Sequence, residues 1–238
     1  GLEVAAAARM LGRSVVVLEG AGQLIARGAT ASLGDYLLRM HEANGVEVVL
    51  GAKVESAWDD GDSVSVQTTR GRFGADLIVV GIGVQPNTEL ARAAGLEVDD
   101  GIVVDSACRT ADPRIFAAGE VTRYPLEKFG VQLRTESWTA ASSQATIAAR
   151  AMLGENARHD ELPWFWSDQF QTNVQSLGLP FLARRFVRIG DASASKWVRI
   201  GLGAKGELVS AEGVNAGREI SALRRADRKG EAIPSWLL

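Results

Sequence analysis

The chain has 238 residues, 46% hydrophobic and 23% charged, which is enough for one large domain or two ordinary domains with packed cores. Its net charge of −3 gives no basic surface for nucleic acid. No apolar run approaches the roughly 20 residues that a membrane-spanning helix needs, so we expect neither nucleic acid nor membrane as a partner.

The cysteine and histidine content limits the redox and metal chemistry that the chain can carry. Cys108 is the single cysteine, which excludes an intrachain disulfide and a Cys-x-x-Cys pair and fits a cytoplasmic protein. We expect it to be a buried packing residue. His41 and His159 have no second histidine or cysteine at ligand spacing, so no metal site is predicted. Because charged residues flank His41 in a predicted helix, we expect its side chain on the solvated face.

The first elements alternate between helix and strand. The chain opens on Gly1 rather than on methionine, with helical periodicity already running, and we expect the natural N-terminus to be missing. An alanine-rich helix is predicted at residues 2–11. The continuous apolar run at 15–18 predicts a strand buried on both faces. A helix at 30–44 and a strand at 46–50 complete an order that is typical of a doubly wound α/β sheet.

The pattern changes after residue 50. Asp60-Gly61 and Arg70-Gly71 are turn signals between short segments, which predicts an antiparallel meander inserted into the α/β domain. The predicted strands of the meander are residues 53–59, 63–69 and 72–75. The elements expected next are a buried strand at 77–84, a short helix at 88–94, strands at 102–104 and 115–118, and a long alanine-rich helix at 135–153.

The tail of the chain differs in composition from the rest. Trp164, Trp166, Trp197 and Trp236 all lie beyond residue 160. The predicted antiparallel strands of the tail are residues 174–177, 186–189, 197–202 and 208–213, and a basic helix follows at 218–229. Residues 156–161 are expected to be a linker. The tail is therefore predicted to be a smaller α+β domain.

The N-terminal segment carries part of a dinucleotide-binding pattern. In a βαβ unit the last glycine of Gly-x-Gly-x-x-Gly permits close helix–strand packing, and an acid about 20 residues later binds the adenosine ribose. Gly1 and Glu19 have that spacing. A carboxylate at Glu19 would repel a 2′-phosphate, which favours NAD over NADP. Since one glycine of the pattern is visible, a packing helix followed by a solvated glutamate remains the alternative.

Glycines also follow two other predicted strands. Gly81 and Gly83 stand at the carboxyl end of the first, where backbone can approach a ligand closely, although an ordinary exit into a turn is the alternative. Residues 110–121 are more specific, because a buried strand there ends in Gly119-Glu120. The glycine lets a cofactor chain pass, and the acid can accept a hydrogen bond from a ribityl hydroxyl.

Together these motifs make the chain resemble the flavin-dependent pyridine nucleotide reductases, and among them the ferredoxin reductase components of biphenyl- and phenylpropionate-type dioxygenases. The similarity runs from residue 1 to about 225. The segments that carry it are GLEVAA (1–6), VVVLE (15–19), VVGIGVQPN (79–87), IFAAGEV (115–121), ESWTAASSQ (136–144) and PWFWSDQ (163–169). The last segment is the most specific to the oxygenase-coupled branch.

The resemblance implies an incomplete glutathione reductase-like α/β fold with two dinucleotide-binding domains, followed by a C-terminal α+β domain. Residues 1–84 would be most of the NAD-binding domain without its first strand, 85–155 the second segment of the FAD-binding domain, and 160–238 the C-terminal domain. FAD and NAD are the implied cofactors and a [2Fe–2S] ferredoxin is the implied partner. No catalytic side chain is expected, since the cofactors carry hydride transfer.

The cofactor-binding residues that the resemblance implies are Gly1, Glu3, Glu19, Arg27, Gly81, Ile82, Gly83, Gly119, Glu120, Glu136, Ser137 and Trp138. Among them, Glu3 would face the nicotinamide, and Glu19 and Arg27 would lie on the adenosine side. Trp138, which opens the long helix, would lie against the isoalloxazine ring. The N-terminus of that helix would favour negative charge on the reduced ring.

Partner binding is assigned to Arg134 and Trp166. An acidic ferredoxin would favour a cation near the exposed flavin edge, and Arg134 is the candidate. Packing in the core of the tail is the alternative for Trp166. The basic helix at 218–229 is expected to be a solvated face rather than a docking site, and the sequence leaves a homodimer open.

Two departures from the family pattern affect this interpretation. Glu120 stands where the family has aspartate, and its extra methylene is absorbed by a change of rotamer or loosens FAD. The first FAD fingerprint is not in the sequence, so we expect the chain as given to be inactive and assign the activity to the intact protein. That activity is an NADH-dependent reduction of the ferredoxin of an aromatic-ring-hydroxylating dioxygenase. The alternatives are a related flavin reductase that serves rubredoxin, a P450 ferredoxin or another acceptor, and an inactive NAD-binding fragment.

Overall fold

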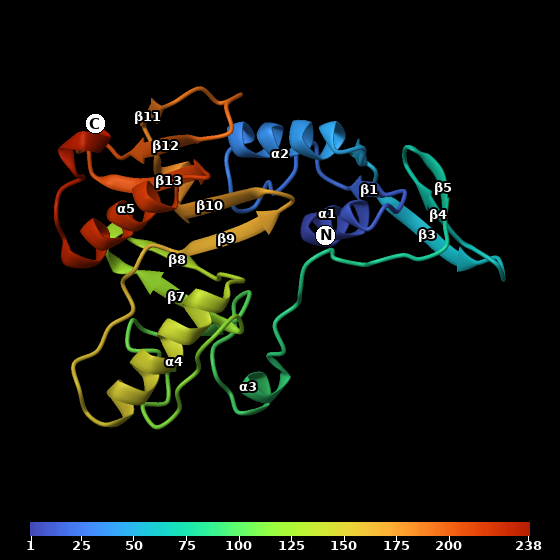
Figure 1. Ribbon diagram of the computed structural model, residues 1–238. Coiled ribbons are helices and arrows are strands. Elements are labelled where there is room, and N and C mark those ends of the chain that lie inside the picture. The colour runs from blue at the N-terminus through green and yellow to red at the C-terminus, as the bar shows by residue number, and fades with distance from the viewer.

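The computed structural model describes residues 1–238, and its mixed helices and sheets confirm the predicted α/β class. The strands form four separate sheets. Figure 1 shows a broad upper layer that holds the N-terminal elements and the C-terminal sheet, and a lower lobe around a long helix. No helix is both long enough and apolar enough to cross a bilayer.

The first elements form the predicted helix–strand–helix–strand unit. Helix α1 (Leu2–Met10) leads to β1 (Val16–Glu19), and α2 (Ala31–Ala43) connects β1 to β2 (Glu47–Leu50). The two strands are parallel, with Val16 opposite Glu47. The strand predicted at 15–18 is only half-buried, because β1 and β2 pair with each other alone. A strand is buried on both faces and both edges only in a wider sheet.

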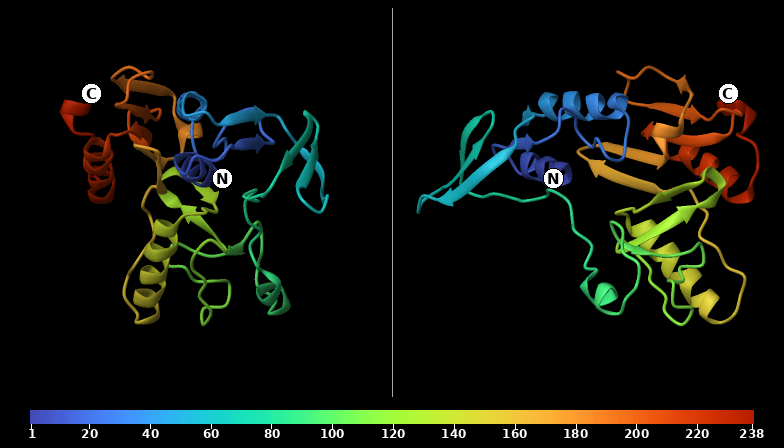
Figure 2. Two further views of the ribbon diagram at one scale, coloured as in Figure 1. Left: turned by 45° about the vertical axis from the view of Figure 1, so that its right-hand side comes forward. Right: turned by 180° about the vertical axis from the view of Figure 1, so that it is seen from behind.

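The predicted meander is confirmed. It consists of β3 (Val54–Asp59), β4 (Val64–Thr68) and β5 (Gly71–Ala75), which pair antiparallel in chain order. The Asp60-Gly61 turn has the conformation that glycine favours, with Gly61 at φ +96°. Figure 2 shows that this three-stranded sheet projects away from the rest of the molecule.

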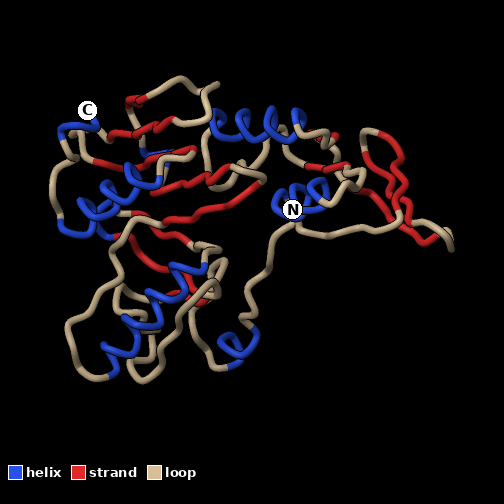
Figure 3. The backbone as a smooth tube through the Cα atoms, in the orientation of Figure 1, coloured by secondary structure: helices blue, strands red, loops and turns tan.

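The buried strand predicted at 77–84 is wrong. The segment has no strand structure and runs as a loop between β5 and α3 (Glu89–Ala93), which Figure 3 shows as a long tan stretch. Ile82 is 87% exposed, although the sequence is apolar. A run of apolar residues forms a buried strand only where neighbouring strands accept its backbone hydrogen bonds, and no strand of the structure pairs with this segment. The strand predicted at 115–118 is similarly reduced to one bridge between Arg109 and Phe116.

The lower lobe contains two strands that the sequence analysis missed. Its three-stranded sheet is formed by β6 (Ile102–Val103), which is parallel to β7 (Thr122–Leu126), and by β8 (Val131–Leu133), which is antiparallel to β7. The long helix α4 (Trp138–Met152) starts later than predicted because Ser137 caps it. The Ser137 side chain accepts a hydrogen bond from the Ala140 backbone N–H, as serine does at helix N-termini.

The C-terminal sheet, defined as strands β9 to β13, confirms the predicted antiparallel tail and adds one strand at its edge. The spatial order is β11-β12-β13-β10-β9, and the edge strand β9 had not been predicted. The bounds are β9 (Trp164–Gln169), β10 (Thr172–Gly178), β11 (Arg185–Ile189), β12 (Trp197–Leu202), β13 (Leu208–Val214) and the helix α5 (Gly217–Lys229). Single turns of 3₁₀ helix lie at Glu127–Phe129, Pro180–Leu182 and Ser235–Leu237.

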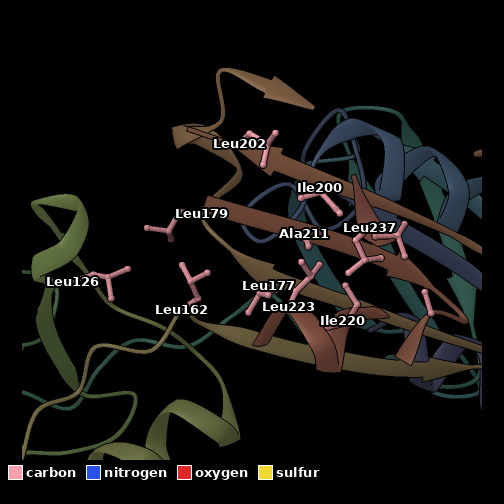
Figure 4. Close-up of a cluster of buried hydrophobic side chains, with 12 residues drawn as sticks. Leu126, Leu162, Leu177, Leu179, Ile200, Leu202, Ala211, Ile220, Leu223 and Leu237 are labelled. Atoms are coloured by element: carbon pink, nitrogen blue, oxygen red, sulfur yellow. The ribbon is translucent and has the colours of Figure 1, made fainter. Parts of the chain in front are cut away.

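Alternate residues of this sheet pack against two different helices. Leu177, Ile200 and Ala211 lie on the face that Ile220 and Leu223 of α5 cover, and Figure 4 shows this cluster. Neighbouring positions point to the opposite face, because strand side chains alternate. There Val174, Trp197 and Val214 pack against Leu33 and Leu37 of α2. The C-terminal sheet is therefore covered on both faces, and α2 belongs as much to it as to β2.

The packing of α2 corrects the expectation for His41. The side chain is fully buried rather than solvated, and its ring meets Phe170 edge to face at 5.2 Å. The turn between β9 and β10 covers this side of α2, which the local charge pattern could not reveal. Burial lowers the pKa of His41 more than its hydrogen bond to Gln169 raises it.

Candidate cofactor-binding site

The N-terminus of α4 is the centre of the candidate site. The Ser137 side chain accepts a hydrogen bond from the Ala140 N–H, and the positive end of the helix dipole lies at this terminus. Trp138, the first helical residue, is 73% exposed. A large aromatic ring that stands in solvent at a helix N-terminus is suited to stack on a planar ligand that carries negative charge.

Gly119 lies beside the second turn of α4. The buried Gln144 Oε1 accepts hydrogen bonds from the Gly119 N–H at 2.7 Å and the Thr122 hydroxyl at 2.8 Å. Gly119 has φ +94°, and a Cβ there would lie 3.8 Å from Ala141. Glu120 follows it and is exposed. The structure therefore keeps the Gly119-Glu120 turn against the N-terminal half of α4.

Gln144 is a site residue that the sequence analysis did not single out. It is the one polar member of a buried helix face otherwise formed by Ala140, Ala148 and Ala151. Its spacing of four residues from Ala140 and Ala148 was the available signal, since helical neighbours on one face recur every three or four residues. An amide in an alanine stripe must find partners, and here the partners belong to the glycine turn.

Gly83 also reaches the start of α4. It has φ +100°, a backbone conformation that favours glycine, and the Arg27 guanidinium lies directly against it, since a Cβ there would be 2.6 Å from Arg27 Nη2. Arg27 Nη1 lies 3.7 Å from Glu136 Oε1. Gly81 lies next to Gly1, since its Cβ would come within 3.3 Å of the Gly1 nitrogen, and Ile82 stands exposed between the two glycines. The loop at 77–84 thus joins the start of α1 to the start of α4.

Glu3 and Glu19 lie on the N-terminal side of this arrangement. Glu3, in the first turn of α1, accepts a hydrogen bond from the Ser167 hydroxyl of β9 at 2.5 Å. Glu19 ends β1, and its Oε1 accepts a hydrogen bond from the Ala21 N–H at 2.8 Å. The end of a parallel strand is where nucleotide ligands bind in open α/β sheets. The role of Glu19 in binding the adenosine ribose stays a prediction.

Arg134 is less accessible than a docking residue would be. Its side chain is 10% exposed and pairs with Glu136 at 2.9 Å and with Asp100 at 3.3 Å. Arg134 and Arg27 therefore both approach Glu136 Oε1, Arg134 at 2.9 Å and Arg27 at 3.7 Å. The role predicted for Arg134 in partner binding stays a prediction, and its observed contacts are internal.

Three tryptophans border a cavity at the N-terminal end of α4. The cavity measures ≈ 290 Å³ and is lined by residues 136–139 and 164–166. Trp138 meets Trp166 edge to face, with ring centroids 6.4 Å apart, and Trp166 stacks on Trp164 at 4.8 Å. Arg224 lies 3.4 Å above the Trp164 ring. Trp164 also packs against the core of the C-terminal sheet, whereas Trp166 stays largely exposed at the cavity.

Titratable groups behind α4 are held neutral. Burial raises the pKa of Cys108 to about 11, with the nearby Asp105 carboxylate adding to the effect, and the thiol is fully buried as expected. Burial also raises the pKa of Tyr124 to about 12. For His159, burial and then the charge of Lys128 lower the pKa to about 4. The shifted pKa values of Cys108, Tyr124 and His159 therefore all follow from burial beside α4.

These residues fit flavin and nicotinamide cofactors. The cavity lies close to the lower end of the roughly 300–1,000 Å³ range of small-molecule sites, and aromatic rings dominate its lining. Gly119, where a Cβ would meet only Ala141 at 3.8 Å, provides a place where backbone can approach a ligand. Of the predicted residues, the structure links Gly81 to Gly1, Gly83 to Arg27, and Arg27 to Glu136 beside Trp138.

Comparison with known proteins agrees with this geometry. The profile of the pyridine nucleotide-disulphide oxidoreductases matches residues 1–145, and that of the reductase C-terminal domain matches residues 164–236. The anthranilate 1,2-dioxygenase system ferredoxin–NAD(+) reductase component of Burkholderia cepacia is 46% identical over 237 residues, which are 98% of this chain and 58% of that protein. The 3-phenylpropionate/cinnamic acid dioxygenase ferredoxin–NAD(+) reductase component of Photorhabdus laumondii is 41% identical over 94% of this chain and 57% of that protein.

Two solved structures share the fold. The ferredoxin reductase for the CYP199A2 system of Rhodopseudomonas palustris has a TM-score of 0.90 at 33% identity and covers 98% of this chain and 58% of that one. Putidaredoxin reductase, in its covalent complex with putidaredoxin, has a TM-score of 0.89 at 31% identity. The match covers 96% of this chain and 55% of that one. The chain thus spans a little over half the length of these relatives. It belongs to the pyridine nucleotide-disulphide oxidoreductase family, whose cofactors are FAD and NAD(H).

Proposed function

We propose that this chain is part of an NADH-dependent ferredoxin reductase that serves an aromatic-ring-hydroxylating dioxygenase. The observation that carries the proposal is the meeting of Gly83, Arg27 and Glu136 beside the exposed ring of Trp138. This contact brings the N-terminal nucleotide-binding unit next to the start of the helix that would face a flavin. The relatives that are 46% and 41% identical are named as ferredoxin–NAD(+) reductase components of dioxygenase systems, which supports the same assignment.

The residues divide the work of binding between the two cofactors. Residues 1–84 would hold NAD, residues 85–155 part of FAD, and 160–238 would form the C-terminal domain. Bound FAD would supply hydride acceptance from NADH and single-electron transfer to a [2Fe–2S] ferredoxin. Gly119 and Glu120 would contact the ribityl chain, and Trp138 would exclude water from the ring face. The positive end of α4 would favour an anionic flavin.

Reconstituted electron transfer tests the proposal. The protein is prepared with the remaining length that its relatives have, loaded with FAD and mixed anaerobically with NADH. We expect NADH to bleach the flavin absorbance, and cytochrome c reduction to require added [2Fe–2S] ferredoxin. A preparation that binds NAD but never takes up flavin would instead support a nucleotide-binding fragment without reductase activity.

A second acceptor is supported by the solved structures. The reductase that matches with a TM-score of 0.90 is named for the CYP199A2 system, and the one that matches with 0.89 is named for its complex with putidaredoxin. Rates with a dioxygenase ferredoxin, a P450 ferredoxin and rubredoxin, measured on one preparation, separate these acceptors. We expect the dioxygenase ferredoxin to give the largest kcat/KM. We also propose a cytoplasmic location and leave a homodimer to be tested by light scattering.

Cofactor choice provides a sharper test of the Glu19 assignment. Glu19 would bind the ribose hydroxyls of NADH and repel the 2′-phosphate of NADPH. We expect Glu19→Arg to lower kcat/KM for NADH and raise it for NADPH, each by about tenfold or more, the size of one charge-assisted hydrogen bond. Glu55→Arg, at an exposed position of the meander, is the matched charge control. An unchanged preference in Glu19→Arg would remove Glu19 from the site.

A further inference from the structure

A continuous line of hydrogen bonds runs from His41 of α2, through Gln169 and Ser167 of β9, to Glu3 in the first turn of α1. Ser167 donates its hydroxyl to Glu3 Oε1 at 2.5 Å. Gln169 Nε2 donates to Ser167 Oγ at 2.9 Å, and Gln169 Oε1 lies 2.8 Å from His41 Nε2. Because an amide oxygen only accepts, His41 Nε2 carries the proton. Every bond in the line then points toward the Glu3 carboxylate.

The line is anchored in the interior and ends at the surface. His41 and Gln169 are buried, Ser167 is half-buried and Glu3 is exposed. The His41 ring is held by Phe170, and its Nδ1 has no partner. A buried nitrogen without a partner costs free energy, so the ring is kept in this place by the packing around it and by its bond to Gln169. Burial lowers the pKa of His41 and so disfavours a second proton on the ring.

The strand that carries the line brings its residues to α1 by geometry alone. Ser167 and Gln169 are two positions apart on β9, so their side chains lie on the same face of the C-terminal sheet. Helix α1 packs against that strand. The Glu3 carboxylate in the first turn of α1 is therefore fixed by residues more than a hundred positions away in the sequence rather than by its own helix.

We propose that Ser167 and Gln169 are positioning residues that hold the Glu3 carboxylate at the nicotinamide ring and so raise the affinity for the oxidised cofactor. The inference rests on the proposed function and on the position at the nicotinamide that the family resemblance implies for Glu3. Loss of hydride turns the neutral dihydronicotinamide into a pyridinium cation. A fixed carboxylate stabilises the cation more than the neutral ring. The line orients Glu3 and moves no proton, because the Gln169 amide interrupts it.

Equilibrium binding without turnover tests this directly. The dissociation constants of NAD⁺ and of 1,4,5,6-tetrahydro-NAD, whose ring is neutral and donates no hydride, are measured by calorimetry on the oxidised, flavin-loaded enzyme. Glu3→Gln is expected to weaken NAD⁺ relative to the neutral analogue by about tenfold, the range of one charged interaction. Ser167→Ala is expected to weaken NAD⁺ relative to the neutral analogue by about threefold, because the carboxylate stays but is no longer held. Gln169→Leu is expected to weaken it in the same direction by a smaller factor.

Two further variants separate positioning from general damage. Ser167→Thr keeps the hydroxyl and is expected to restore the ratio of the two affinities. Ser65→Ala is the matched control, since the Ser65 hydroxyl donates to a carboxylate at 2.6 Å in the remote meander. It is expected to leave the ratio unchanged. The double variant of Glu3→Gln and Ser167→Ala should match Glu3→Gln alone, because Ser167 acts only through Glu3.

The outcomes distinguish this inference from the function on which it rests. If Glu3→Gln changes the ratio and Ser167→Ala does not, the positioning role is overturned and the nicotinamide assignment of Glu3 stands. Additive effects in the double variant also overturn it. If Glu3→Gln itself leaves the ratio unchanged, Glu3 does not face the nicotinamide, and both the placement and the positioning role fail.

Discussion

Strand β12 and the loop at 77–84 are both rich in apolar residues, and they have opposite fates. In β12, alternate residues pack against α5 on one face and α2 on the other, and both edges are paired. The loop pairs with no strand and exposes Val80 and Ile82. The difference shows that an apolar run becomes a buried strand only when partners for its edges and covers for its faces are supplied elsewhere in the chain.

Truncation of apolar side chains should show this contrast most strongly. Leu223→Ala, in the core beneath the C-terminal sheet, is expected to lower the free energy of unfolding by about 2–5 kcal/mol because it leaves a cavity. Ile82→Ala is the matched exposed variant and should change it by less than about 0.5 kcal/mol. Urea denaturation measures both. Equal losses would mean that the loop at 77–84 packs in solution as tightly as the sheet.

Acid should weaken the lower lobe through His159. The folded pKa of His159 is about 4, below the ordinary 6.5, so the unfolded chain takes up a proton first as the pH falls. Stability that is present above pH 6.5 is therefore lost as the pH falls toward 4, by up to about 3 kcal/mol from this residue. His159→Phe should flatten the pH dependence of the unfolding free energy over this window. Parallel curves for the two proteins would contradict the assignment.

A smaller effect is expected where α2 meets the C-terminal sheet. The Thr30 hydroxyl donates to the buried Glu212 carboxylate at 2.6 Å and accepts a hydrogen bond from Arg199 at 2.8 Å. Thr30→Val removes both bonds and should lower the free energy of unfolding by about 1–2 kcal/mol. Thr146→Val, whose hydroxyl bonds only within α4, is the control. A single unfolding transition in Thr30→Val would show that α2 and the sheet still unfold together.

The elements predicted correctly from the sequence are those whose formation depends on residues close to one another in the chain. The Asp60-Gly61 turn set the meander, and helical periodicity set α2, because both depend on residues close in sequence. The motif around Gly119 was recognised as well. The burial of His41 could not be predicted, since Phe170 and Gln169 cover it from a strand far along the chain. The strand predicted at 77–84 was wrong for a related reason. The local sequence is typical of a strand, but a strand forms only when it pairs with another strand, and that pairing is nonlocal.

The candidate site divides in the same way. The glycine positions could be found from spacing, whereas the cap at Ser137 was missed, and the contact of Arg27 with Gly83 and Glu136 depends on the tertiary fold. Arg134 was expected to be an accessible cation, yet its pairing with Asp100 and Glu136 depends on how β8 approaches the loop before β6. Ion pairs between distant segments leave no periodic trace in a sequence.

Helix α2 has one consequence for how the molecule can move. Its apolar residues interdigitate with Trp197 and Val214 of the C-terminal sheet and also with Val48 and Leu50 of β2. A tilt of the sheet must carry the helix with it, and the helix must carry the strand. Packing through α2 therefore couples the tail of the chain to the first α/β layer.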